Sequence, residues 1–226
     1  MRDNVLNAKT RLHEGLEHLR GRHCAGAGGR TVGRDLAQLR DQTVLDLVNA
    51  ALADLNEAGA DELSSEIALV AHGGSGRREV APGSDVDLMI LHTPAVADCM
   101  SPLANRLLRD VFDAGLMLGH SVRTIPQACR LAISDATICT SLIDARLLAG
   151  SAILFDRFQE QFARQVRQHV RKLLPEILRV RAEERIRYGE TVFLLEPNVK
   201  RSRGALRDVQ LLHWIGFTRY GPSRKS

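Results

Sequence analysis

The sequence has few cysteines, few aromatic residues and no long apolar run. Its four cysteines show neither a C-x-x-C pair nor a histidine pattern typical of zinc ligands, so we expect reduced, mostly buried thiols. No apolar stretch approaches the ~18 residues of a membrane-spanning helix, and the N-terminus lacks an apolar signal segment. These absences exclude a disulfide-rich secreted protein and a membrane-inserted one, and they predict a cytoplasmic protein.

Two common nucleotide-binding motifs are also absent. No G-K-[ST] follows the glycine-rich turns, which excludes a P-loop, and no G-x-G-x-x-G indicates a dinucleotide-binding fold. The sequence has no internal repeat and no low-complexity tract. Any nucleotide chemistry must therefore use another arrangement of residues.

The composition is that of a globular protein with one large or two small domains. The chain has 226 residues, of which 44% are hydrophobic and 26% are charged. The formal net charge of +4 is uneven, because residues 41–66 are acidic whereas residues 156–226 are rich in arginine and lysine. A basic half suits a nucleotide, a nucleic acid or an acidic protein face, while a solvated arginine-rich helix explains the charge equally well.

Helical periodicity dominates, and a small group of strands interrupts it in the middle third of the chain. Apolar residues at helical spacing predict helices over 4–20, 34–58, from Pro102 onward, 135–149, 151–188 and 205–219. The long helix should break near Leu174, because Pro175 follows. Short apolar runs between Gly, Pro and Asp predict strands over 67–74, 85–92 and 118–126.

This order predicts an α+β fold in which helices flank a small sheet and a helical region follows. We expect an N-terminal helix and glycine-rich loop over 1–33, a mixed α/β domain over 34–150 and the helical region over 151–226.

Asp85 and Asp87 are separated by one residue at the start of the second predicted strand. Side chains at i and i+2 of a strand point to the same face, with α-carbons ~6.5–7 Å apart. Two carboxylates at that distance repel each other unless a cation lies between them, and Mg²⁺ typically takes one or two carboxylates together with substrate phosphates. The pair therefore predicts a metal site for phosphoryl or nucleotidyl transfer.

A glycine-rich turn precedes these aspartates. Gly73 and Gly74 allow the backbone to approach a ligand, and Ser75 can cap the turn or helix that follows. Backbone N–H groups at such a start bind phosphate, and Arg77 and Arg78 supply positive charge nearby. Each piece alone is more often an ordinary turn or a surface pair. Together, in the order G-[GS]-x(~10)-D-x-D, they are typical of the polymerase-β-like nucleotidyltransferase superfamily.

Four segments resemble one family within that superfamily, the bacterial PII-protein uridylyltransferase/uridylyl-removing enzymes. They are GGSGRREVAPGSDVDLMIL (73–91), LGHSVRT (118–124), SDATICTSLIDARLLAG (134–150) and YGETVFLLEPNVKRSRGALRDVQLLHWIGFTRYG (188–221). The last is the most specific, because the family has an L-E-P-N-[IV]-K…G-[GA]-L-R-D-[IV]-Q run there. The resemblance covers about residues 35 to 221 and matches the N-terminal nucleotidyltransferase region of the family. It implies a nucleotidyltransferase domain over 34–150, with a small mixed sheet of polymerase-β-like type flanked by helices, and over 151–226 the start of the family's post-catalytic helical domain.

The resemblance implies a reaction. Members of this family transfer UMP from UTP, with Mg²⁺, to a tyrosine of the nitrogen-signalling PII protein, so UTP and PII are the expected partners and nucleic acid is not. Asp85 and Asp87 are then the expected catalytic residues and metal ligands. The expected nucleotide-binding residues are Gly73, Gly74, Ser75, Arg77 and Arg78.

The sequence also departs from the family. The strand over 118–124 has no acid where the superfamily has a third carboxylate, which leaves as candidates Glu79, Asp113, Asp135 and Asp144. Family members are several times longer and continue into an HD domain that removes UMP and ACT domains that sense glutamine. This chain has no H-D dipeptide and no room for either, so we expect both functions to be absent. The alternative is a catalytically silent fragment, or a regulatory or binding module with the same fold.

Polar residues outside the aspartate pair allow two interpretations. His72 and His120 are more often structural than catalytic at strand ends, and His120 is kept as a candidate base. The segment with Glu196, Asn198, Lys200 and Arg207 is either a solvated connector or folds back over the nucleotide.

Overall fold

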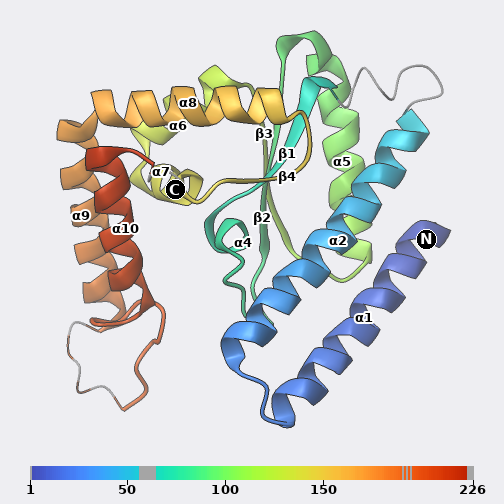
Figure 1. Ribbon diagram of the computed structural model, residues 1–226, viewed down its shortest axis with the longest axis horizontal. Helices are drawn as coiled ribbons and strands as arrows, with labels where there is room; N and C mark the ends of the chain where they lie inside the picture. Colours follow the sequence, from blue (N-terminus) through green and yellow to red (C-terminus); the bar gives the residue numbers. More distant parts are fainter. Residues whose placement is uncertain (1, 56–64, 190, 192, 194, 223–226) are drawn as a thin grey trace. The chain divides into compact units, whose positions relative to one another are not determined.

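The computed structural model describes residues 2–55, 65–189, 191, 193 and 195–222. The chain divides into two compact units (Figure 1). The first unit comprises Met1–Ile125 and Asp144–Asp156, and the second comprises Pro126–Ile143 and Arg157–Ser226. The predicted domain boundaries at 33/34 and 150/151 stay predictions.

A four-stranded mixed sheet forms the centre of the first unit. Its strands are β1 (Ile67–Ala71), β2 (Val86–His92), β3 (Leu118–Arg123) and β4 (Arg146–Gly150). They lie in the order β3-β2-β1-β4, and β1 is antiparallel to both of its neighbours while β2 and β3 are parallel. The predicted α+β class with a small mixed sheet is confirmed.

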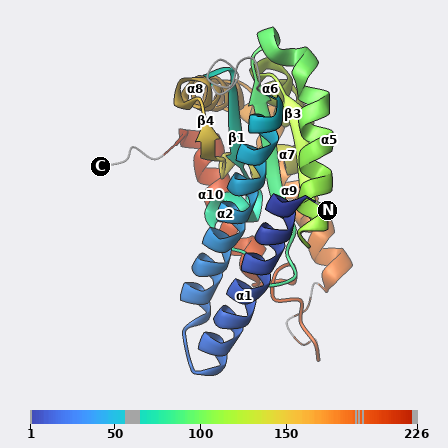
Figure 2. The same ribbon diagram turned by 90° about the vertical axis from the view of Figure 1, so that its right-hand side faces the viewer.

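Helices α1 (Asp3–Cys24), α2 (Gly29–Leu55) and α5 (Ala97–Asp113) pack together on one face of the sheet of the first unit. Helix α1 lies beside α2, as Figure 2 shows, and both contact α5. The short helices α4 (Gly73–Arg77) and η1 (Pro94–Val96) complete the unit.

One apolar cluster joins these helices to the sheet. The alternate residues Val86, Leu88 and Ile90 of β2 face it, because successive side chains of a strand point to opposite faces. From the helices come Val5, Leu12, Val44, Leu47, Leu103, Leu107 and Val111. The opposite face of β2 is thereby left to Asp87, Met89 and Leu91.

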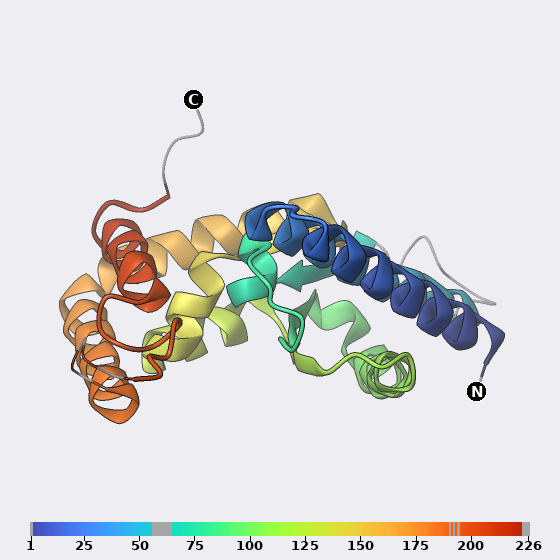
Figure 3. The same ribbon diagram turned by 90° about the horizontal axis from the view of Figure 1, so that it is seen from below.

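The second unit is helical in the part that the structure describes. It contains most of α6 (Ile125–Ser134) and α8 (Ala152–Gln168), with α7 (Ala136–Ile143), α9 (Val170–Tyr188) and α10 (Leu206–Tyr220). Helices α9 and α10 lie side by side (Figure 3). Their core contains Ala136, Ile177, Leu211 and Trp214, and Phe162 contacts both Phe158 and Phe217 with ring centroids 5.7 and 5.8 Å apart.

A buried arginine holds the segment between α9 and α10. The side chain of Arg181 is only 2% exposed and pairs with Asp208 at 2.9 Å and with Glu184 at 3.1 Å. Its guanidinium also donates to the carbonyls of Arg201 and Ser202. The L-R-D run of the family motif therefore has a structural role here, since Asp208 is a counter-charge of this arginine.

Several predicted elements were wrong in detail. The helix expected over 135–149 ends at Ile143, and residues 146–150 form β4 instead. Helix α6 was not predicted at all, because Pro126 was read as the end of a strand rather than as the second residue of a helix. The N-terminal loop is short, because α1 continues to Cys24 and α2 already begins at Gly29. The predicted end of the second helix at residue 58 lies outside the described residues.

Both helical prolines are tolerated inside helices. Helix α5 begins at Ala97, so Pro102 lies within it and not at its start. The long helix breaks at His169, whose ring lies 2.9 Å from the Gln165 carbonyl, and Pro175 lies inside α9. Burial of Leu173 and Ile177 beside Pro175 explains this, since packing of an apolar face outweighs one missing hydrogen bond.

All four cysteines are free thiols, as expected, but only Cys129 and Cys139 are buried. Burial raises the pKa of Cys129 to about 11 and that of Cys139 to about 12, so both are inert near neutral pH. Cys24 and Cys99 are exposed.

Among the residues with described positions, no helix has the length and apolarity needed to cross a membrane. The cytoplasmic location stays a prediction.

Replacing Arg181 with methionine should destabilise the helical unit by about 3 kcal/mol, because it removes a buried donor from the carbonyls of Arg201 and Ser202 and one cationic partner each from Asp208 and Glu184. Arg179→Met is the matched control, since Arg179 lies on the same helix and also pairs with two glutamates but is exposed. Chemical denaturation followed by circular dichroism measures both. Equal stability of the two variants would contradict the structural role of Arg181.

Candidate active site

The carboxylates of Asp85 and Asp87 converge beside β3. Asp87 lies opposite Gly119 in the parallel register of β2 and β3. A Cβ built on Gly119 would lie 3.1 Å from Oδ1 of Asp87 and 3.9 Å from Oδ2 of Asp85. Both carboxylates therefore face the same point on one side of the sheet, as their i, i+2 spacing predicts.

The glycine-rich turn forms helix α4 between β1 and β2. Its first hydrogen bond of helical type runs from Gly76 N–H to the His72 carbonyl, so the N–H groups of Gly73, Gly74 and Ser75 precede the helical ladder. The predicted cap was wrong, because Ser75 lies inside α4 and the residue at the cap position is His72.

The same turn holds the backbone of Asp87. The His72 N–H donates to the Asp87 carbonyl at 3.1 Å, and the Asp87 N–H donates to Ser75 Oγ at 3.1 Å. Both backbone polar groups of this aspartate are thus bonded to the glycine-rich turn. The glycine-rich turn and the carboxylate pair form one connected structure.

Helix α4 in turn rests against β4. A Cβ on Gly76 would lie only 1.9 Å from the Asp144 carbonyl oxygen, so glycine is required at this close approach. Arg146 of β4 donates to the carbonyls of Ser75 (3.0 Å) and Gly76 (3.2 Å) and pairs with Asp41 at 2.8 Å. Burial raises the pKa of Asp41, and the charge of Arg146 opposes this rise.

The two arginines after the glycines differ in their surroundings. Arg77 pairs with the buried Asp144 at 2.5 Å and with Glu79 at 2.8 Å. Arg78 is exposed and adopts the left-handed conformation with φ 56°, the one non-glycine residue of the described chain at positive φ. A side chain costs roughly 1–2 kcal/mol there, and such outliers concentrate at functional sites.

The candidates for a third carboxylate lie elsewhere or are already bonded. Asp144 and Glu79 pair with Arg77, and Asp113 is exposed in the last turn of α5. Asp135 accepts the N–H groups of Thr137 and Ile138 at the start of α7. Over the described ranges, no group of three or more His, Cys, Asp or Glu side chains is placed to hold a metal ion.

The aspartate pair nevertheless fits a divalent cation such as Mg²⁺. Its donors are hard carboxylate oxygens, and Mg²⁺ commonly takes one or two carboxylates while substrate phosphates and water supply the rest. Glycine at position 119 keeps open the space that any side chain would fill. A glycine inside a strand weakens it, and close approach of a ligand is a common reason for one there.

The two histidines lie on opposite faces of the sheet, because His72 follows Ala71, the partner of Leu88, and so lies opposite Asp87 on the carboxylate face. Burial lowers the pKa of His72, so its ring is neutral at pH 7 in the cap of α4. His120 is exposed and follows Gly119 in β3, so its side chain points to the opposite face from the carboxylates.

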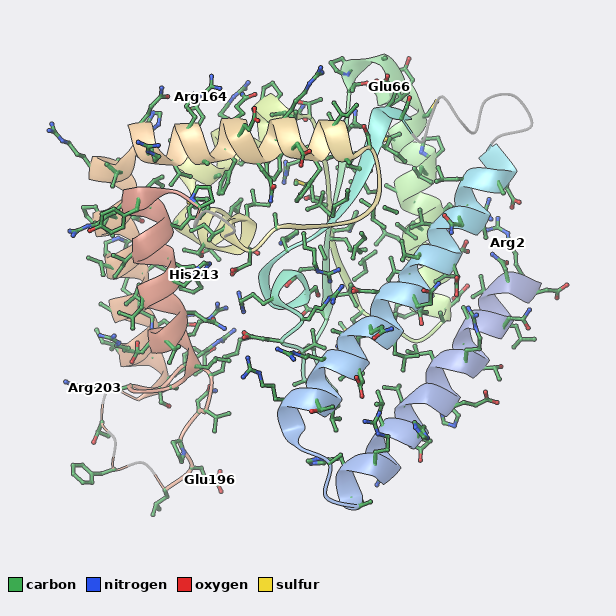
Figure 4. The ribbon with its side chains drawn as sticks, viewed as in Figure 1. Arg2, Glu66, Arg164, Glu196, Arg203 and His213 are labelled. Atoms are coloured by element: carbon green, nitrogen blue, oxygen red, sulfur yellow. The ribbon has the colours of Figure 1, made fainter. Side chains whose placement is uncertain are left out.

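The polar segment before α10 is organised within its own unit. Asn198 Oδ1 accepts the N–H groups of Lys200 and Arg201, and the guanidinium of Arg207 lies 5.3 Å from the centre of the Trp214 ring. Figure 4 shows Glu196 and Arg203 on this segment and Arg164 on α8. A role of this segment at the nucleotide stays a prediction.

Arg40 was not predicted as a site residue, although its position in the sequence indicates that it is buried. Arg40 lies four residues after Leu36 and four before Val44, on the buried face of α2, where a charge needs a reason. Its Nη2 donates to the Pro82 carbonyl at 2.6 Å. Burial lowers the pKa of Arg40, and the charge of Asp85 opposes this. Gly76, Asp41 and Arg146 were missed as well, since their partners are distant in sequence.

Gly76→Ala should destabilise the protein by about 1–3 kcal/mol, because the added methyl group meets a backbone oxygen and helix α4 has to move. Gly83→Ala is the control, since a Cβ there meets nothing within 4 Å. Both substitutions reduce the conformational entropy of the unfolded chain by a similar amount. The difference between the two variants in thermal unfolding therefore reports the contact of the added methyl group at position 76. A Gly76→Ala protein as stable as the control would show that α4 does not pack tightly on β4.

His72 should make stability depend on pH. The unfolded imidazole takes a proton as the pH falls below about 6.5, whereas the buried ring resists it, so the free energy of unfolding falls below that pH. The loss approaches about 1.4 kcal/mol per pH unit while the two states differ by one proton. Urea denaturation between pH 7.5 and 5.5 should show a smaller loss for His72→Gln than for the unsubstituted chain. Equal slopes would contradict a buried neutral His72.

Comparison with known proteins identifies two matching family models. One is described as a putative nucleotidyltransferase (DUF294) and matches residues 13–123. The other is described as GlnD PII-uridylyltransferase and matches residues 156–222. The first match contains α4 and both aspartates, so the chain carries a nucleotidyltransferase-type domain.

Curated relatives are named bifunctional uridylyltransferase/uridylyl-removing enzyme. The relative from Aromatoleum aromaticum is 36% identical over 213 residues, which are 93% of this chain and 23% of that protein. The relative from Streptomyces coelicolor is 40% identical over 176 residues, 78% of this chain and 21% of that protein. The chain thus spans about a fifth of the length of these relatives. Together with the aspartate pair and the glycine-rich turn, these matches show that the chain belongs to the uridylyltransferase/uridylyl-removing enzyme family.

Proposed function

We propose that the chain is a Mg²⁺-dependent nucleotidyltransferase that transfers UMP from UTP to a tyrosine of a PII signalling protein. The observation that carries the proposal is the convergence of Asp85 and Asp87 over Gly119, directly beside the glycine-rich turn. Uridylyl transfer is taken from the names of the relatives, and PII from the description of the second family model. The tyrosine and UTP follow from the resemblance of the sequence motifs.

The glycine-rich turn binds the triphosphate in this proposal. The N–H groups of Gly73, Gly74 and Ser75 begin a helix, and N–H groups in that position favour phosphate oxygens. Arg78 is the exposed cation at the other end of α4 and can pair with a phosphate. Arg77 acts through Asp144 to hold the turn, since its guanidinium is already bonded there.

Asp85 and Asp87 hold Mg²⁺, which when bound neutralises charge on the phosphates. Through this ion the two aspartates would bind the α-phosphate, while the N–H groups of the turn hold the β- and γ-phosphates of the leaving group. The acceptor oxygen forms a bond to the α-phosphorus, the bond to the β-phosphate oxygen breaks, and pyrophosphate leaves. The phenol proton passes to water.

Incubation with α-³²P-labelled UTP, Mg²⁺ and a PII protein should label PII when the 226-residue chain is added. Asp87→Asn should lower the rate on the order of 10³-fold, because losing a metal ligand removes several kcal/mol of transition-state stabilisation. Asp113→Asn is the control, since Asp113 is an exposed carboxylate of α5 that lies outside the site. Labelling that survives the loss of both Asp85 and Asp87 would contradict the proposal.

Calorimetry, together with the labelling assay, separates this enzyme from the alternatives. An enzyme binds UTP with metal and labels PII, whereas a binding module of the same fold binds UTP without transfer. No binding at millimolar UTP would contradict both and would favour a catalytically silent fragment.

A further inference from the structure

Three arginines of the described chain are buried, and one of them lacks a full set of partners. Arg106 pairs with Asp54 and Asp110, and Arg181 pairs with Asp208 and Glu184. Arg40 is only 5% exposed, yet its Nε and Nη1 atoms are buried without a hydrogen-bond partner among the described residues. A buried cation with unsatisfied donors is unfavourable, and proteins retain such groups mainly for function.

The position of Arg40 indicates that function. Its Nη2 donates to the carbonyl of Pro82, which belongs to the connecting turn (residues 81–84) between α4 and β2. This turn is closed by two hydrogen bonds, from Ala81 N–H to Ser84 Oγ and from Ser84 N–H to the Ala81 carbonyl, both 3.0 Å long. The next residue is Asp85, so Arg40 fixes the turn that leads directly into the carboxylate pair.

Charge gives the second link. Asp85 has an electrostatic interaction with Arg40, whereas no carboxylate of the described chain lies within ion-pair distance of Arg40. Asp85 is exposed toward the site, so its charge compensates the buried guanidinium from outside and is not consumed in a close ion pair. That arrangement leaves the carboxylate oxygens available to a cation.

We propose that Arg40 is a positioning residue: it anchors the connecting turn through Pro82 and holds Asp85 beside Asp87 in a geometry ready for the metal. This inference rests on the proposed function. If Arg40 had a purely structural role, replacing it would lower the free energy of unfolding. A positioning role predicts that this free energy is not lowered, because the removed charge is buried and partly unsatisfied, and that the connecting turn is released.

The test uses Arg40→Met, with Arg40→Lys as the variant that keeps the charge and Arg34→Met as the matched control. Arg34 lies on the same helix and is exposed. Electron paramagnetic resonance of free Mn²⁺, in the presence of UTP, measures metal binding by each 226-residue chain. Arg40→Met should weaken Mn²⁺ binding at least about tenfold, as loss of a residue that supports a metal ligand commonly does. Arg40→Lys should recover most of this loss, and Arg34→Met should bind like the unsubstituted chain.

Three results would overturn the role of Arg40. They are unchanged or tighter Mn²⁺ binding by Arg40→Met, a free energy of unfolding of Arg40→Met well below that of Arg34→Met, and no recovery by Arg40→Lys. A different result addresses the proposed function: an unsubstituted chain that fails to bind Mn²⁺ with UTP contradicts that function, and the role of Arg40 with it.

Discussion

The close contact between Gly76 and the Asp144 carbonyl determines where the rest of the site can lie. Because no side chain intervenes, helix α4 lies directly on the start of β4, where Arg146 bonds the carbonyls of Ser75 and Gly76. Ser75 then accepts the Asp87 N–H, so the position of the carboxylate depends on a contact between residues almost seventy positions apart. A site assembled in this way is held by backbone contacts and not by flexible side chains.

The aspartate pair has a firmly held backbone and accessible carboxylates. The backbone of Asp87 is bonded on both sides to the glycine-rich turn, whereas its carboxylate and that of Asp85 face the space above Gly119. Like charges brought together without a cation oppose folding, and such an arrangement is retained where a ligand supplies the missing charge. The strained conformation of Arg78 and the unsatisfied donors of Arg40 lie in the same part of the fold.

Local signals made part of this structure predictable. The same-face geometry of Asp85 and Asp87 follows from strand alternation, and a small sheet follows from short apolar runs between turn residues. Strand β4 could not be found from local signals. Its five residues follow a helix and pair with β1, which lies almost eighty positions earlier in the chain. Arg146 and Asp41, 105 residues apart, were hidden for the same reason. The helix start predicted at Pro102 and the helix break predicted beside Pro175 were wrong, because tertiary burial outweighs local propensity.

The central claim is that Asp85 and Asp87 together hold the metal that binds the nucleotide. Anomalous diffraction at the manganese edge, from crystals grown with Mn²⁺ and a non-hydrolysable UTP analogue, tests it most directly. The account predicts an anomalous peak about 2.0–2.3 Å from an oxygen of each aspartate, with phosphate oxygens completing the coordination. Bound nucleotide with an anomalous peak away from either carboxylate would contradict it.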